Sequence, residues 1–82
     1  MAIKIDSEKG VIGGRGLKPM MQDVEILADS EADITALPAY GEPVTDMDGS
    51  AVIPAKGSVA YTADLAVGYM MSPSGVWTKF KG

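Results

Sequence analysis

The sequence contains no cysteine and no histidine, and each absence excludes a class of chemistry. Without cysteine, the chain can form neither a disulfide framework nor a cysteine-based metal site. Without histidine, it lacks the usual general base near neutral pH and the commonest protein ligand for metals. The serine and threonine hydroxyls have no histidine to activate them, and no motif pairs them with a lysine. The sequence therefore predicts a protein that is not an enzyme and carries no cofactor and no metal.

The sequence also lacks a long apolar run and a block of charge of one sign. Its longest apolar stretches fall far short of the roughly 20 residues that span a bilayer as a helix. The first residues turn charged at once, without the apolar core of a signal peptide. Eleven acidic residues against seven basic ones give a formal net charge of −4, which disfavours binding to phosphate backbones. We expect a protein made in the cytoplasm that binds neither membrane nor nucleic acid.

The chain is short, which limits the core that it can form. Its 82 residues correspond to one domain at most, and a chain of this size buries only about 60–65% of the surface that it exposes when unfolded. We therefore expect modest stability unless a partner or a second copy covers one face. The predicted fold class is α+β, mainly β: a small antiparallel sheet, built on a C-terminal three-stranded meander, with one short helix packed on it.

The clearest pattern lies in the final third of the chain, where alternating segments are separated by turn residues. The segments are residues 58–63, 67–72 and 76–80. Each has the period of two that places successive side chains on opposite faces of a strand. The tetrapeptide SPSG at residues 72–75 is the strongest turn signal, because proline fits position i+1 of a type I turn and glycine fits position i+3. We predict a meander in which Met71 or Met70 lies near Trp77.

Aromatic side chains are few, and this meander holds the only Trp, the only Phe and two of the three Tyr. Aromatic residues dominate small cores, so packing inside the domain is the first interpretation. A surface that contacts another protein is the second, and the alternation does not show which face of the sheet is exposed. The candidate contact surface consists of Tyr61, Tyr69, Met71, Trp77 and Phe80.

Before the meander, the sequence predicts one strand and one short helix. Residues 24–28 alternate as a strand does. Ser30 can cap a helix over residues 31–37, because its hydroxyl can accept from the free N–H groups of the first turn. Pro38 ends this helix, since the residue before a proline is pushed out of the α region. A helix this short cannot stand alone, so we expect it to rest on the sheet.

The dipeptide Asp48-Gly49 is a hairpin signal between two short strands. Together with Asp46, it also hints at a calcium-binding loop. With Gly49 at loop position six, however, positions one and twelve are Val44 and Ala55, so both key ligands are missing. The segment therefore predicts a hairpin and no calcium site.

The sequence divides the chain into residues 1–23 and residues 24–82, of which the second part is the β-rich domain. Residues 2–5 alternate as a short strand does, and residues 6–23 contain four glycines between positions 10 and 16. This glycine cluster lacks the GKS/T ending of a phosphate-binding loop and the G-x-G-x-x-G register of a dinucleotide fold. We predict a flexible arm there, which a partner can order.

Several short motifs follow one another from residue 27 to residue 80: ALP at residues 36–38, TD at 45–46, PAKGSVAYTAD at 54–64 and SPSGVW at 72–77. Together they resemble small proteins encoded among the capsid and tail genes of phages and prophages of Gram-positive bacteria. Such proteins are described as head fibre or minor structural proteins. The likeness is one of a structural module and implies no catalytic residues.

This resemblance implies a non-enzymatic accessory protein of a virion: a head fibre, a capsid decoration or a tail-associated subunit. Its partner would be a capsid or tail protein of the same phage, and fibre-like proteins tend to form homotrimers. Such a protein would be made in the host cytoplasm and reside in the virion. The alternative is a small non-structural module, encoded on a mobile element, that binds a host protein through one exposed aromatic patch.

Overall fold

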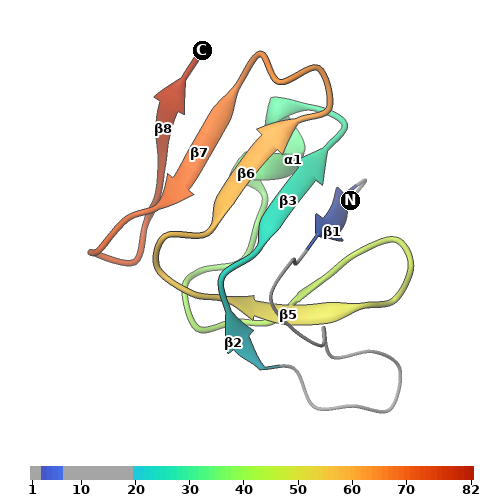
Figure 1. Ribbon diagram of the computed structural model, residues 1–82, viewed down its shortest axis with the longest axis vertical. Helices are drawn as coiled ribbons and strands as arrows, with labels where there is room; N and C mark the ends of the chain where they lie inside the picture. The colour runs from blue at the N-terminus through green and yellow to red at the C-terminus, as the bar shows by residue number, and fades with distance from the viewer. Residues whose placement is uncertain (1–2, 7–19) are drawn as a thin grey trace.

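Two mixed sheets and one short helix make up the part of the chain that the structure, a computed structural model, describes: residues 3–6 and 20–82 (Figure 1). The prediction of a small, mainly β fold of the α+β class is confirmed. The elements in chain order are β1 (Ile3–Asp6), β2 (Met21–Gln22), β3 (Glu25–Ala28), α1 (Glu31–Thr35), β4 (Val44–Thr45), β5 (Ala51–Pro54), β6 (Val59–Thr62), β7 (Gly68–Met71) and β8 (Trp77–Lys81).

The larger sheet has five strands in the order β1-β3-β6-β7-β8. Its last three strands are the predicted meander, because β6 pairs with β7 and β7 pairs with β8, both antiparallel. The turn between β7 and β8 forms where it was predicted. Gly75 has a φ of +82°, and its N–H donates to the Ser72 carbonyl at 2.9 Å. The strand register places Met71 opposite Trp77, which is one of the two predicted pairings.

The first two strands join the meander through a parallel pair that the sequence pattern did not predict. β3 pairs in parallel with β6, and the chain between them crosses over through α1, β4 and β5. β1 pairs antiparallel with β3 and forms one edge of the sheet. Parallel neighbours require a crossover connection rather than a tight turn, so no local turn signal marks this pair in the sequence.

Helix α1 begins as predicted but is shorter than the predicted residues 31–37. Ser30 caps it, accepting from the Asp33 N–H at 3.4 Å. Beyond its end, the Leu37 N–H donates to the Ile34 carbonyl at 3.0 Å, which forms one tighter turn of the 3₁₀ type. The helix packs against β3 and β6 (Figure 1). Ile34 and Leu37 are buried, at 1% and 9% exposed, so the helix rests on the sheet as expected.

The smaller sheet, ordered β2-β5-β4, contains the predicted hairpin. β4 pairs antiparallel with β5, and Gly49 in the connecting turn has a φ of +86°. β2 adds in parallel to the other side of β5, a pair that was not predicted. The two residues of β2 are too few to show a pattern in the sequence.

A buried carboxylate joins the hairpin to the larger sheet. Asp46 is 7% exposed and accepts three backbone N–H groups, from Ile5 at 3.1 Å, Asp48 at 3.0 Å and Ser50 at 2.9 Å. Nearby, the Met47 N–H donates to the carbonyl of Ile3 at 3.2 Å. The residues that hinted at a calcium loop thus hold the turn in shape and cover the free edge of β1.

The described segments of residues 1–23 belong to the same fold as residues 24–82. β1 is a strand of the larger sheet, and β2 is a strand of the smaller one. The boundary predicted between residues 23 and 24 therefore does not separate two units within the described residues. The flexible arm predicted over residues 6–23 falls mainly on residues 7–19, which lie outside the described residues.

Candidate contact surfaces

The larger sheet has two faces that differ in burial, and its inner face holds the core. Ile26 and Ala60 on this face are 0% exposed, and Met71 is 1% exposed. They lie under α1 and the smaller sheet, whose apolar residues belong to the same cluster as Ile26 and Ala60. Tyr69 and Trp77 are partly buried against this cluster. The inner face therefore provides the packing that the sequence predicted for part of its aromatic residues.

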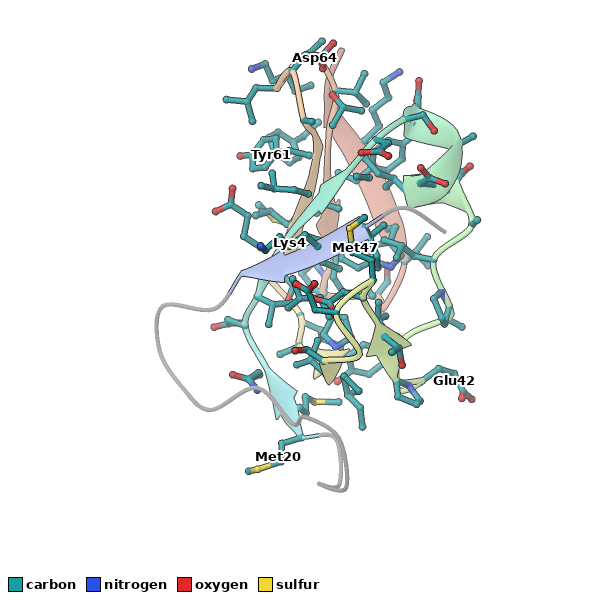
Figure 2. The ribbon with its side chains drawn as sticks, turned by 90° about the vertical axis from the view of Figure 1, so that its right-hand side faces the viewer. Lys4, Met20, Glu42, Met47, Tyr61 and Asp64 are labelled. Carbon is teal, nitrogen blue, oxygen red and sulfur yellow. The ribbon has the colours of Figure 1, made fainter. Side chains whose placement is uncertain are left out.

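The opposite side of the sheet carries an apolar surface, here called the outer face, that consists of Leu27, Val59, Tyr61, Met70 and Phe80. The strand register brings them together, because Leu27 lies opposite Tyr61 and Val59 lies opposite Met70. Met70 is 41% exposed and Phe80 is 50% exposed, and the other three are half-buried. Figure 2 shows Tyr61 on the side of the sheet away from α1. No described helix or strand covers this face.

Gly68 shapes the centre of the outer face. A Cβ atom at this position would lie 2.9 Å from Phe80 Cζ and 3.0 Å from Tyr61 Cε1. Because glycine has no Cβ atom, the rings of Tyr61 and Phe80 can close over β7. They meet edge to face, with ring centroids 5.8 Å apart. Aromatic pairs favour this geometry because the positive edge of one ring meets the negative face of the other. Phe80 is therefore held in place although it is half exposed.

Charged residues of both signs border the outer face on the side of β1. Lys4 lies opposite Leu27 in the register, and Glu25 is two residues from Leu27 on the same strand. The Lys4 Nζ atom is 3.8 Å from the Asp48 carboxylate, and both side chains are well exposed. Exposed ion pairs of this kind contribute little to stability, so Lys4 is available to a second partner.

The turn between β6 and β7 is organised by Asp64 at one end of the outer face. Its carboxylate accepts from the Thr62 hydroxyl at 2.6 Å and from the Ala66 N–H at 3.1 Å. These hydrogen bonds, the Thr62 bond first, lower the pKa of Asp64 below its usual value. The turn also holds Leu65 at a φ of +62°, a conformation that is uncommon for residues other than glycine. Asp64 stabilises this turn while it is ionised.

A second apolar surface is a groove of about 350 Å³ on the inner side of the sheet. It runs between the end of α1, with the residues that follow it, and the β7–β8 turn. Its lining includes Leu37, Pro38, Tyr40, Tyr69, Val76 and Trp77. Tyr40 packs against Gly75, where an added Cβ would lie 3.3 Å away, and the Lys56 Nζ atom lies 5.3 Å from the centre of its ring. The groove is therefore aromatic, with a cation at one side.

Trp77 carries an unpaired polar group beside this groove. Its Nε1 atom is buried and has no hydrogen-bond partner among the described residues. A buried donor without an acceptor costs about 1–3 kcal/mol. An acceptor from water or from a bound partner would remove this penalty, provided that the indole becomes accessible on binding.

A polar cluster joins the helix to the last two strands near the groove. The Glu31 carboxylate accepts from the Tyr69 hydroxyl at 2.7 Å and lies 3.0 Å from Lys79 Nζ. The Tyr69 bond, followed by the Lys79 interaction, lowers the pKa of Glu31. The same hydrogen bond to Glu31 raises the pKa of Tyr69. The cluster therefore stabilises ionised Glu31 and neutral Tyr69, and it fixes α1 against β7 and β8.

The five residues predicted as one contact surface do not share a face. Tyr61 and Phe80 lie on the outer face, whereas Tyr69, Met71 and Trp77 lie on the inner face. Met71 is 1% exposed and cannot contact a partner in this conformation. The physical reason is the alternation along β7 and β8, which sends neighbouring residues of each strand to opposite faces.

Sequence reasoning missed three members of the outer face: Leu27, Val59 and Met70. The signal that could have found them is the apolar character of both faces in β6 and β7. Val59, Ala60 and Tyr61 are all apolar or aromatic, although strands exposed on one side usually alternate apolar with polar residues. A strand with two apolar faces indicates that both are covered, either within the chain or by a partner.

Within residues 3–6 and 20–82, no group of three acidic side chains lies close enough to hold a metal ion. Over the same residues, no helix has the length and apolar character to cross a membrane. Comparison of the chain with protein-family models, with curated protein sequences and with solved structures found no match.

Proposed function

We propose that this chain is a non-enzymatic accessory subunit of a phage or prophage particle, acting through protein–protein contacts as a head fibre, capsid decoration or tail-associated protein. The proposal rests on the resemblance of residues 27–80 to such proteins and on one structural observation. That observation is the presence of two apolar surfaces, the outer face and the groove, on opposite sides of one small sheet. Exposed apolar patches bordered by polar residues are typical of sites of interaction.

Two opposed surfaces suit a subunit of an assembly. A subunit that sits between neighbours needs at least two contacts, whereas a binding module that captures one target needs one. The outer face is broad and follows the pleat of the sheet, while the groove is narrow and concave. These shapes fit different partners, a flat surface for the first and a projecting apolar side chain for the second.

The groove is the surface that we assign to the capsid or tail protein. An apolar side chain from that protein would insert between Tyr40 and Val76. Val76 is 59% exposed at the groove, so contact there would bury apolar surface that is now in water. Hot spots of protein interfaces are enriched in tryptophan and tyrosine in this way.

The direct test is the composition of purified particles. Mass spectrometry of phage particles produced from the genome that encodes this chain is expected to detect the polypeptide in many copies per particle. If it is absent from particles and a purified monomer instead binds a defined host protein, the alternative holds. The observation that favours this alternative, a small non-structural binding module, is the groove. One concave aromatic site is sufficient for such a module, which does not need the outer face.

A pair of matched variants tests the groove. Val76→Glu places a charge in the groove, whereas Met20→Glu places the same charge on a residue that is 64% exposed and lies at the far end of the molecule from Tyr61 (Figure 2). We expect Val76→Glu to weaken binding to particles that lack the protein by at least about tenfold. Met20→Glu is expected to have no effect, because Met20 is not among the residues that line the groove. Equal binding by both variants would exclude the groove as the contact.

A further inference from the structure

We propose that the outer face joins two copies of this chain, face to face, across a two-fold axis that runs perpendicular to the strands. This inference deepens the proposed function and rests on it for the idea that the outer face is a contact surface. It assigns the outer face to self-association and leaves the groove for the particle. Three properties of the outer face support a second copy as its occupant, and a fourth, its size, sets the expected affinity.

The first property is the sequence of the central strands. β6 and β7 carry apolar side chains on both faces, which is typical of strands that are covered on both sides. The inner side is covered by α1 and the smaller sheet, and no described element covers the outer side. Two sheets that pack face to face lie about 10 Å apart and fill the space between them with such side chains. A second copy supplies an identical sheet for this purpose.

The second property is the arrangement of charge at the β1 side of the face. Lys4 is level with Leu27, and Glu25 lies one row away on the neighbouring strand. Consider a two-fold axis that lies between the two sheets, perpendicular to the strands and level with Ile26. It places the row of one copy that contains Lys4 and Leu27 over the row of the other copy that contains Glu25. Glu25 of each copy then lies over Leu27 of the other copy, one strand away from that copy's Lys4, which is within reach of a long lysine side chain. Two reciprocal ion pairs form between Lys4 and Glu25 across the axis. Interfaces between identical subunits are self-complementary in this manner.

The third property is the match of side chains across the same axis. Val59 and Met70 form one cross-strand pair on the outer face, and Tyr61 and Gly68 form the next pair along the strands. The axis would place the Val59–Met70 pair of one copy over the Tyr61–Gly68 pair of the other. Met70 of one copy would then rest on the Tyr61–Phe80 ring pair of the other. Methionine adapts to aromatic surfaces and gains from sulfur–aromatic contact. Smaller Val59 would oppose larger Tyr61, so the two surfaces interlock.

The fourth property is the size of the face. Five strands at a spacing of about 4.8 Å, with about four residues each at about 3.3 Å, give a surface of roughly 20 × 13 Å. This is a fraction of the roughly 800 Å² per partner that standard interfaces bury. A pair of such faces therefore supports weak association, with a dissociation constant between about 10 µM and about 1 mM. Such an affinity produces dimers where subunits are concentrated on a particle.

Sedimentation equilibrium of the full chain, from about 5 µM to about 1 mM, tests the inference. We expect a monomer–dimer equilibrium in the wild type. Met70→Lys is expected to weaken dimerisation by at least about tenfold, and Met20→Lys, the same change at an exposed methionine away from the face, is expected to leave it unchanged. Circular dichroism and Trp77 fluorescence show whether each variant is folded.

Charge reversal supplies a second test that does not depend on Met70. Lys4→Glu and Glu25→Lys are each expected to weaken the dimer, and the double variant is expected to restore it to within about twofold, because the reciprocal pairs re-form with opposite signs. A monomer throughout the concentration range, a trimer, a dimer insensitive to Met70→Lys, or a double variant that stays weak would each overturn the proposal. Particle composition would be unaffected by any of these results, so the two proposals fail separately.

Discussion

Removing the buried carboxylate of Asp46 is expected to destabilise the protein strongly. This side chain accepts three backbone N–H groups and connects the β4–β5 turn to the edge of the larger sheet. Alanine removes all three acceptors. Asparagine keeps the shape and one acceptor oxygen, but it places an NH₂ group against either the Ile5 N–H or the two N–H groups of the turn. The two variants therefore separate the loss of shape from the loss of acceptors.

The expected magnitude follows from where the three donors lie. The bond to Ile5 is buried, so its loss leaves a buried donor and costs about 1–3 kcal/mol. The donors of Asp48 and Ser50 are partly exposed and can bond to water, so we assign about 0.5–1 kcal/mol to each. Asp46→Ala is then expected to lower the free energy of unfolding by about 3 kcal/mol, and Asp46→Asn by about 1.5 kcal/mol. An 82-residue domain has only about 4–12 kcal/mol in total.

Urea denaturation followed by circular dichroism measures these differences, provided that the slopes of the transitions agree. Asp48→Asn is the matched control, because its carboxylate is exposed and, among the residues that the structure describes, makes only the 3.8 Å ion pair with Lys4. We expect this control to change stability by less than about 0.5 kcal/mol. If Asp46→Asn is as stable as the control, the three hydrogen bonds do not hold the turn to β1 and the reasoning is refuted.

Two further predictions concern the contacts that fix α1 and β3. Because hydrogen bonding lowers the pKa of Glu31, its contribution to stability is present above the ordinary glutamate pKa and is lost as the pH falls through the lowered value. The difference in unfolding free energy between wild type and Glu31→Gln is therefore expected to narrow on acidification, and a constant difference would contradict this. The hydroxyl of Ser58, which is 1% exposed, accepts from the Val24 N–H at 3.1 Å. Ser58→Ala is expected to destabilise by about 1–3 kcal/mol in thermal unfolding, and an unchanged midpoint would count against it.

Local signals in the sequence were sufficient to predict most of the elements. The SPSG turn, the alternation on either side of it and the Ser30 cap each depend on residues that are close together in the chain, and the structure contains all three. The same holds for the hairpin at Gly49. These features are local because propensity, capping and turn geometry act over a few residues.

The topology and the contact surfaces depend on interactions that local patterns do not record. The parallel pairing of β3 with β6 unites segments that are more than 30 positions apart, as in the match of Ile26 with Ala60. The face on which an aromatic residue lies follows from this pairing and, for Phe80, from the register shift between β7 and β8. Sequence reasoning grouped Tyr61 with Tyr69 because both are aromatic, although the sheet places them on opposite faces.

Two adjacent methionines report directly on whether the sheet has one covered and one uncovered apolar face. Met70 is 41% exposed on the outer face, and Met71 is 1% exposed in the interior. NMR of ¹³C-methyl-labelled methionine, with a soluble paramagnetic agent added, measures the solvent access of each methyl group. At concentrations where the protein is a monomer, we predict strong relaxation of the Met70 methyl group and little of the Met71 methyl group, with Met70 becoming protected as the concentration rises. Equal relaxation of the two groups in the monomer would contradict the account.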